Sequence, residues 1–365
     1  MDLVTHGVAS FALQRALWPK AKSLVVVVIL FSGILPDIDW FSSLSGPRAY
    51  LAWHRAPTHS LVGWLALSIL AVILPYVVVL SFGGTRSGGV AIPLGKGGPR
   101  QTGEDPQTLA PRGVHALFGS MLLASICSLF LHLSLDLCQA DGVALLWPFS
   151  PRRFALDLLP GFDLWLLIIL AAAILLPELF LLVGEEIGSR AKRPRGQKGA
   201  IIGLACAAVY LSARFLVHGN AVASLESHTI AGEMPRRVGA FPDSTSPFLW
   251  HSVVETQSTL DILDLRSAGG EVTEASGVTT LHKPEPSPML TAAQNSPAAI
   301  AFLTLARFPK ATVENETEGS AVEIHDLKDQ ATREKHHAIF ADINLDKQHN
   351  IVSSQLQWQK NSENP

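Results

Sequence analysis

The sequence predicts an α-helical membrane bundle of about six helices, the first two short, followed by a small, mainly β domain. Hydrophobic residues make up 48% of the 365 residues and charged residues only 16%, which is too apolar for an ordinary soluble protein of this length. The long apolar runs all lie before residue 220, and the remainder is polar with short alternating strings. We therefore divide the chain into a membrane domain, residues 1–219, and a soluble domain, residues 220–365.

Apolar runs define the predicted helices. Four of them approach or exceed the roughly 20 residues that a helix needs to cross about 30 Å of hydrocarbon. They cover residues 60–82, 114–138, 162–184 and 199–217. Two shorter runs, 4–18 and 23–36, are separated by Pro19, Lys20 and Lys22 and predict a short helical hairpin. No small-residue cleavage site follows the second run, so we expect this segment to be retained rather than removed as a signal peptide.

The soluble domain carries apolar residues in the alternating or mixed strings that are typical of β-strands. The strings LDILDL, AVEIHDL, AIFADINL and IVSSQLQW fit this pattern. Asp346 to Asn350 separates the last two strings like a hairpin turn.

The charge distribution predicts the orientation. With six helices, the loops on one face carry twelve Lys and Arg residues, and those on the other carry four, namely Arg48, Arg55, Arg152 and Arg153. Because basic loops stay preferentially in the cytoplasm, we expect the face with four, and with it the soluble domain, to be extracytoplasmic. The Gly- and Pro-rich segment from Gly83 to Arg112 is then expected to be a flexible cytoplasmic connection.

Composition also argues against two classes of function. Residues 1–220 hold 17 Lys and Arg against 12 Asp and Glu, whereas residues 221–365 hold 11 against 19 and show no basic patch interleaved with aromatic residues. Nucleic-acid binding therefore has little support. Cys127, Cys138 and Cys206 all lie in apolar runs, which gives neither a disulfide framework nor a CxxC metal site.

Ionisable residues in or beside membrane helices are costly to desolvate, so their positions are informative. Four groups occur, and the six-helix scheme places all of them on the extracytoplasmic side: His6; Asp37 and Asp39; His54 and His59; His132 and Asp136. His132 and Asp136 are four residues apart and share one helix face. Imidazole and carboxylate ligands suit zinc, manganese or iron, and seven candidates exceed what one ion requires. We predict a site for one or two divalent ions, with zinc or manganese as the metal.

Each group also has a plainer interpretation. His6 could be an interfacial residue, the PDID aspartates a helix stop, and the pair His54 and His59 a contact with lipid headgroups. His132 and Asp136 could form a structural hydrogen bond. Their common side in the topology favours the metal site.

The polar strings resemble the YdjM-like family of bacterial inner-membrane proteins, which are metal-dependent hydrolases. The matching strings are MDLVTHGVAS, GILPDIDW, HRAPTHSLVGW, LHLSLDLCQADGVALLWPFSPRRFAL and DLLPGFDLW, within residues 1–220. The strings FPDSTSPFLWHSVVET and FLTLARFP are similar to the tail of some members. The resemblance implies metal ligation by His6, Asp37, Asp39, His54, His59, His132 and Asp136, in a bacterial inner membrane. A thinner similarity of spacing to zinc-dependent phospholipases C and nucleases suggests a phosphoester substrate.

These features support a hypothesis for the mechanism. Of two ions, one would lower the pKa of a water molecule and the other would polarise the phosphoryl or carbonyl oxygen. We expect Asp39 to bridge the ions or accept the proton of the water. Arg55, Arg152 and Arg153 lie on the same face and could clamp an anionic group, or could snorkel beside headgroups. A site at the outer surface of the bilayer favours lipid-linked or envelope substrates.

Two non-enzymatic functions remain open. In a transporter, His132 and Asp136 would line a path through the membrane, although internal repeats are not evident. In an envelope sensor or scaffold, the metal would only brace the helices, and closed coordination without an exchangeable water would favour that alternative.

Overall fold

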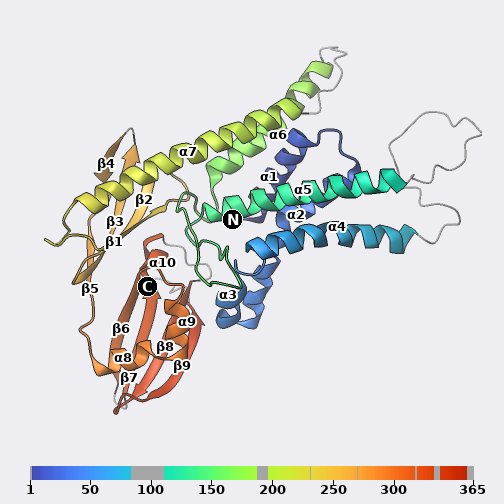
Figure 1. Ribbon diagram of the computed structural model, residues 1–365. Coiled ribbons are helices and arrows are strands. Elements are labelled where there is room, and N and C mark those ends of the chain that lie inside the picture. The colour runs from blue at the N-terminus through green and yellow to red at the C-terminus, as the bar shows by residue number, and fades with distance from the viewer. Residues whose placement is uncertain are drawn as a thin grey trace, which may run out of the picture.

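The computed structural model describes residues 2–83, 111–186, 196–230, 232–268, 270–316, 319–332 and 338–359. Helices fill the N-terminal part of the chain, and two antiparallel sheets follow in the C-terminal part, as predicted. Figure 1 shows both sheets at one end of the helices, next to the N-terminus. The segment 84–110, predicted to be a flexible connection, lies outside the described residues.

The six predicted helices are present. They are α1 (Leu3–Leu17), α2 (Ser23–Ile34), α4 (Leu61–Gly83), α5 (Pro111–Leu137), α6 (Leu164–Glu186) and α7 (Gln197–Ser227). Two further helical segments, η1 (Leu35–Ser45), a 3-10 helix, and α3 (Pro47–Trp53), lie where the sequence predicts a loop between the second and third helices. Helix α7 runs past residue 220, so the division between the two predicted domains falls inside a helix.

Within the described residues, three segments are long and apolar enough to span a membrane: Ser23–Ser45, Leu117–Leu137 and Gln197–Ser227. Two shorter apolar helical stretches are Leu61–Pro75 and Leu164–Phe180. Large apolar side chains are exposed along these helices, for example Ile69 and Phe180 at 49% and 71%. Such a surface is stable in hydrocarbon and unfavourable in water, which agrees with a membrane location.

Small residues let α1, α2 and α5 approach closely. Ser32 of α2 and Ser125 of α5 share a hydrogen bond of 2.7 Å, and Ser128 donates to the carbonyl of Ile29 over 2.8 Å. Gly33 lies directly against Ser10, where no side chain would fit. Hydroxyl and glycine contacts of this kind are how helices associate in lipid, where burial of apolar surface gives little driving force. They fix α1 and α5, which carry three of the clustered polar residues, and α2, which leads directly into η1.

The C-terminal part begins with a sheet of five strands. These are β1 (Arg237–Pro242), β2 (Leu249–Glu255), β3 (Thr259–Ala268), β4 (Glu271–Glu274) and β5 (Thr279–His282), in the order β1-β2-β3-β4 with β5 also paired to β3. Two short helices, α8 (Pro288–Gln294) and α9 (Pro297–Leu303), lead to the second sheet.

The second sheet has four strands in chain order. They are β6 (Pro309–Glu316), β7 (Gly319–Asp326), β8 (Ile339–Asp346) and β9 (Ile351–Trp358), with α10 (Leu327–Thr332) between β7 and β8. All four predicted strings lie in strands, one in β3 and three in β7 to β9. The predicted turn is present, because the carboxylate of Asp346 accepts hydrogen bonds from the backbone of Gln348 and Asn350.

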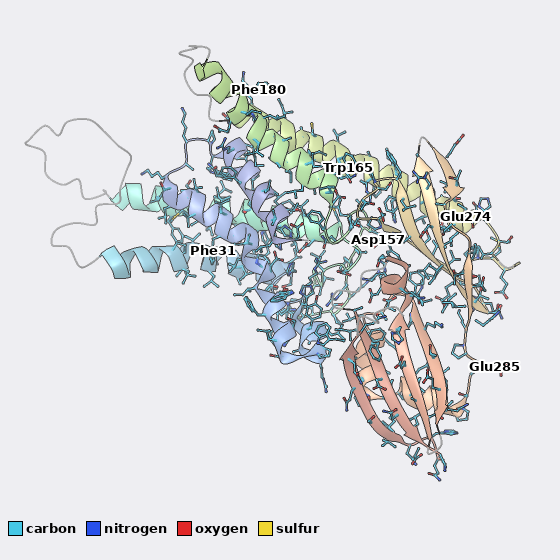
Figure 2. All side chains as sticks on the ribbon, turned by 180° about the vertical axis from the view of Figure 1, so that it is seen from behind. Phe31, Asp157, Trp165, Phe180, Glu274 and Glu285 are labelled. Carbon is cyan, nitrogen blue, oxygen red and sulfur yellow. The ribbon has the colours of Figure 1, made fainter. Side chains whose placement is uncertain are left out.

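Ion pairs join the sheets to the loops at the same end of the bundle. Arg307 forms a bidentate pair with Asp157, at 2.5 and 2.8 Å, and Lys328 pairs with Asp141 at 2.5 Å. Trp165 at the start of α6 donates to the carbonyl of Thr245 over 3.0 Å. Figure 2 shows Asp157 between the helices and the sheets, with Phe180 at the far end of α6.

Candidate metal centre and adjoining cavities

Three elements bring four of the predicted ligands to one point. His6 comes from α1, Asp37 from η1, and His132 and Asp136 from α5. One ligand atom from each residue lies within 4.8 Å of those of the other three. Both histidines are 1% exposed and Asp136 is fully buried, whereas the Asp37 side chain is 19% exposed. The cluster is therefore closed except on the Asp37 side.

Asp136 lies at the centre of the cluster. Its Oδ1 lies 3.2 Å from Nε2 of His6, and its Oδ2 lies 2.9 Å from Nε2 of His59 and 3.3 Å from Nε2 of His132. Asp37 Oδ1 lies 3.6 Å from His132 Nε2 and 3.9 Å from His59 Nε2. His59 thus adjoins the group of four, and its ring nitrogen faces the same point.

The orientation of His132 depends on the close approach of α2 and α5. Its Nδ1 donates a hydrogen bond of 2.8 Å to the carbonyl of Gly33, which leaves Nε2 directed at the carboxylates. A histidine whose second nitrogen is held by a backbone carbonyl has a fixed tautomer and ring orientation as a ligand. The ring of His132 also stacks on that of His6, with centroids 3.7 Å apart.

Asp39 lies beside this group rather than in it. Its Oδ1 lies 3.1 Å from His54 Nδ1, and its Oδ2 accepts from the backbone of Arg55 and the hydroxyl of Thr58, both at 2.7 Å. The same Oδ2 lies 3.0 Å from His59 Nδ1. Because η1 has about three residues per turn, Asp37 and Asp39 point in different directions. Asp37 faces the cluster, and Asp39 holds the two histidines of the following turn.

The turn that carries His54 and His59 has an unusual backbone. Arg55 has a φ of 54°, in the left-handed region that non-glycine residues rarely adopt. Its backbone N–H is held by Asp39, and its guanidinium is buried against Gln139 and Asp136. Burial lowers the pKa of His54, although its hydrogen bond with Asp39 opposes the shift. His54 therefore carries a neutral imidazole near neutral pH, as a metal ligand must.

Unpaired polar atoms indicate that the cluster fits a cation. Among the described residues, His6 Nδ1 and Asp37 Oδ2 are buried without a hydrogen-bond partner. Buried polar groups are nearly always paired, so each of these atoms lacks a partner that the described residues do not provide. A divalent ion on imidazole nitrogen and carboxylate oxygen would satisfy this donor set.

The three arginines predicted to bind substrate lie in different surroundings. Arg55 is buried, with Nη2 3.6 Å from Asp136. Arg153 donates to the carbonyl of His54 over 2.8 Å and supports the turn from behind. Arg152 is exposed and stacks over Phe154. Only Arg55 adjoins the cluster directly.

A groove of about 520 Å³ opens beside the cluster. Its walls are apolar side chains from the start of α1, the end of α2 and η1, and Asp37, His54 and Arg55 lie along its polar side. The volume is within the usual range for sites that bind small molecules, roughly 300 to 1,000 Å³.

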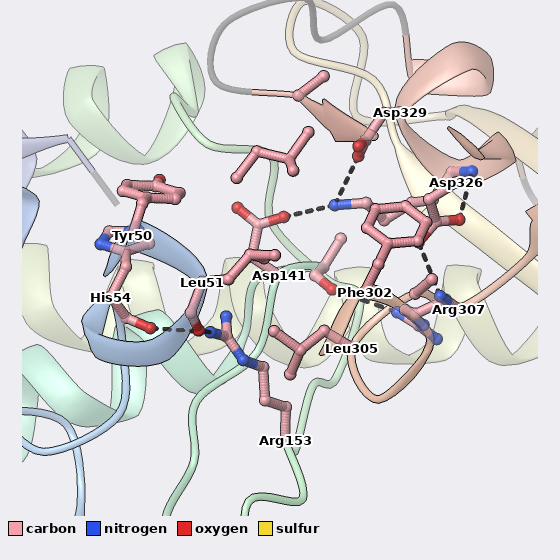
Figure 3. Close-up of a pocket in the computed structure, with 15 residues that line it drawn as sticks. Tyr50, Leu51, His54, Asp141, Arg153, Phe302, Leu305, Arg307, Asp326 and Asp329 are labelled. Carbon is pink, nitrogen blue, oxygen red and sulfur yellow. Dashed lines mark hydrogen bonds and ion pairs between the residues drawn. The ribbon is translucent and has the colours of Figure 1, made fainter. Parts of the chain in front are cut away.

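A second, smaller cavity of about 130 Å³ lies between the helices and the sheets (Figure 3). Tyr50, His54 and Arg153 line it from the helical side, and Arg307, just before β6, and Lys328 of α10 line it from the C-terminal part. His54 thus lies between the two cavities, and its ring stacks on that of Tyr50 with centroids 4.4 Å apart.

The charged side chains at this cavity shift one another's pKa values. Lys328 and, less strongly, Arg55 hold the pKa of Asp141 well below its ordinary value. Burial disfavours the ammonium of Lys328, yet Asp141 and Asp329 raise its pKa well above the usual range. Burial raises the pKa of Asp329 to about 6, and Lys328 opposes this shift.

Several residues at the site were missed by the sequence reasoning. Gln139 accepts from Arg55, Thr58 binds Asp39, and the carbonyl of Gly33 holds His132. Gln139 and Thr58 stand within three residues of predicted ligands, so their neighbourhood was a signal that could have found them. Nothing near Lys328 or Arg307 in the sequence indicates a role at the site, because their positions there depend on how the C-terminal part packs against the helices.

Comparison with known proteins agrees with this organisation. The model of the YdjM inner membrane protein family matches residues 1–221, which include all the helices of the cluster. No curated protein and no solved structure matches the chain. The match covers more than half of the sequence, and the chain belongs to the YdjM inner membrane protein family.

Proposed function

We propose that the chain is a membrane-bound, metal-dependent hydrolase that cleaves a phosphoester. The observation that carries this proposal is the convergence of His6, Asp37, His132 and Asp136 within 4.8 Å, at a buried point with one open side. A cluster that only braced helices would have no need of an opening. Asp37 lines both the cluster and the groove, so a substrate in the groove can reach the ligands.

The ligand set supports one or two divalent ions, with zinc or manganese proposed. His6, Asp37, His132 and Asp136 would hold the first ion, and His54, His59 and Asp39 extend the donor set. Bound there, a divalent ion would supply Lewis-acid chemistry, polarising a phosphoryl oxygen and lowering the pKa of water. In the hydrolysis a water oxygen bonds to phosphorus, the ester P–O bond breaks, and one proton passes to the departing oxygen.

The side chains of the protein position the ligands and the anionic group, and they accept a proton. Asp39 is the proposed proton acceptor, and its contacts with His54 and His59 give it a second role in positioning both rings. Arg55 is proposed to contact the anionic group, because its Nη1 is buried without a hydrogen-bond partner among the described residues. Arg153 acts through the turn that it supports, and Arg152 would contact substrate only from the surface.

Metal analysis of the purified protein tests this function. We expect close to stoichiometric zinc or manganese, and His132→Ala and Asp39→Asn should each remove most of it. His282→Ala, at an exposed histidine of β5, is the matched control and should keep the metal. Hydrolysis of bis-p-nitrophenyl phosphate should follow the metal content across these variants. Unchanged metal in both site variants would refute the proposal.

We also propose that the cluster and the sheets lie on the extracytoplasmic side. The support is the unequal count of basic residues between the two faces, together with the position of both sheets at the end of the bundle that holds the cluster (Figure 1). Alkaline phosphatase fused to the C-terminus should be active in cells, and green fluorescent protein fused there through a Sec-dependent route should be dark. The reverse result would place the site in the cytoplasm.

A further inference from the structure

The groove beside the cluster differs from an ordinary lipid-facing surface in two ways: it encloses a cavity, and one end of that cavity is polar. Its apolar wall consists of Leu3, Phe31, Ile34, Leu35, Ile38, Trp40 and Phe41. Leu3, Ile38 and Phe41 are each more than half exposed. Its polar residues are Asp2, Asp37, His54 and Arg55, so two carboxylates face one guanidinium and one imidazole. One continuous space therefore joins a hydrocarbon-like surface to the candidate metal ligands.

The position of the groove in the chain indicates where it opens. All its wall residues except Leu3 belong to Ser23–Ser45, one of the segments suited to span a membrane. Trp40 is 44% exposed at the end of that segment, and tryptophan is enriched where hydrocarbon meets headgroups. An opening at this depth faces acyl chains and headgroups rather than bulk water.

The polar end is suited to an anionic headgroup. Arg55 contributes a guanidinium whose Nη1 has no hydrogen-bond partner among the described residues, and guanidinium groups bind phosphate through paired donors. The Asp37 side chain is the most exposed of the four clustered ligands, and its Oδ2 is likewise unpaired in the described chain. A phosphate between Arg55 and a metal at Asp37 would satisfy both groups.

We propose that the groove binds one hydrocarbon chain of a membrane phospholipid, with the phosphate of its headgroup beside Arg55 and facing the candidate metal site at Asp37. The substrate then enters sideways from the bilayer, and its chain fixes the position of the phosphate. This inference rests on the proposed function for the reaction, but the binding of the chain depends only on the groove. A water-soluble phosphoester would reach the same polar end without using the apolar wall.

Photo-cross-linking of the full-length protein in detergent micelles, loaded with zinc, tests the inference. The probe is phosphatidic acid with a diazirine at the end of one acyl chain, and labelled peptides are identified by mass spectrometry. We expect label to concentrate on Phe31–Phe41 and Leu3. Unlabelled phosphatidic acid should displace the probe, whereas the same concentration of inorganic phosphate should not.

A matched pair of variants sharpens the test. Ile34→Trp adds bulk to the wall of the groove and should lower labelling at least fivefold. Ile69→Trp, at an exposed position on α4, should leave it unchanged. Label spread evenly over the outer helix faces, or displacement by inorganic phosphate alone, would overturn the inference.

Metal content measured on the same samples separates this inference from the proposed function. Localised labelling in a protein that holds no metal would support the groove and refute the hydrolase. Stoichiometric metal with unlocalised label would refute the groove and leave the hydrolase standing.

Discussion

Lys328 of α10, which follows β7, and Asp141 of the membrane region form an ion pair of 2.5 Å, and the other oxygen of Asp141 lies 3.8 Å from Arg55 Nη1. Arg55 in turn has its Nη2 3.6 Å from the central carboxylate of Asp136. A chain of alternating charges therefore runs from the sheets to the candidate metal ligands. Docking of the sheets and the electrostatics of the cluster are coupled through Arg55.

Lys328→Met should lower the thermal stability of the protein in detergent. The substitution leaves Asp141 and the half-buried Asp329 without their shared cation, a loss that costs about 1–3 kcal/mol. A double-mutant cycle with Asp141→Asn should show that the second substitution costs much less when Lys328 is already absent. Arg266→Met, at an exposed position on β3, should have little effect. Strictly additive losses for Lys328 and Asp141 would contradict the coupling.

The pH dependence of stability should reveal Asp329. Burial raises its pKa in the folded protein to about 6, from an ordinary value of 3.8. The folded chain therefore binds the carboxyl proton of Asp329 more tightly than the unfolded chain does. The resulting stabilisation of the fold is full below about pH 4 and is lost as the pH rises through 6. Asp329→Asn cannot ionise and should raise the Tm at pH 7.5, by the equivalent of about 2–3 kcal/mol. At pH 4.5 its effect should be small.

Asp346→Asn is the contrasting control for that measurement. Hydrogen bonds from Asn350 and the neighbouring backbone lower the pKa of Asp346 in the folded protein. Its ionised carboxylate therefore stabilises the fold at pH values above its ordinary pKa of 3.8, and this stabilisation is lost as the pH falls. The substitution should lower the Tm at pH 7.5. An Asp329 variant that follows the same direction as Asp346 would show that its carboxyl is not destabilised by burial.

The helices could be predicted because hydrocarbon imposes a simple rule on sequence. A run such as residues 60–82 must be helical to satisfy its backbone in lipid, and α4 starts and ends within one residue of that run. The stretch after Pro36 could not be predicted in the same way. Polar and apolar residues are mixed in this stretch without a helical period. Helix η1 forms there because its residues pack beside α2 and α3.

The site could be predicted only in part. Sidedness grouped all seven candidate ligands, since helices of known length bring their ends to a common depth, but it could not single out the four that lie within 4.8 Å of one another. The different directions of Asp37 and Asp39 could not be foreseen, because they follow from the 3-10 geometry of η1. The roles of Lys328 and Arg307 depend on how two separate regions pack, and that information is not local in the sequence.

Removal of metal should destabilise the protein. A ligand that binds only the folded chain adds about 2.7 kcal/mol when present at one hundred times its Kd. Treatment with a chelator should therefore lower the Tm by several degrees, and added zinc or manganese should restore it. His132→Ala should show the same Tm with and without chelator. A chelator effect that persists in this variant would locate the stabilising metal elsewhere.

Gly33→Ala should disrupt the cluster without touching a ligand. A Cβ at Gly33 would lie 1.9 Å from Ser10 Oγ and 3.2 Å from Ser128 Oγ, so α2 must move away from α1 and α5. The carbonyl of Gly33 would move with it and release Nδ1 of His132. We expect an overpacking cost of about 1–3 kcal/mol and a metal content at least halved.

Gly119→Ala on α5 is the matched control for this prediction. No atom lies within 4 Å of a Cβ at Gly119, and alanine is the better helix former, so stability should rise by up to about 1 kcal/mol. Metal content should stay at the level of the unmodified protein. Full metal retention in Gly33→Ala, measured beside this control, would contradict the prediction. It would show that His132 binds the metal without its hydrogen bond to the Gly33 carbonyl, because the shift of α2 would have left the ligands in place.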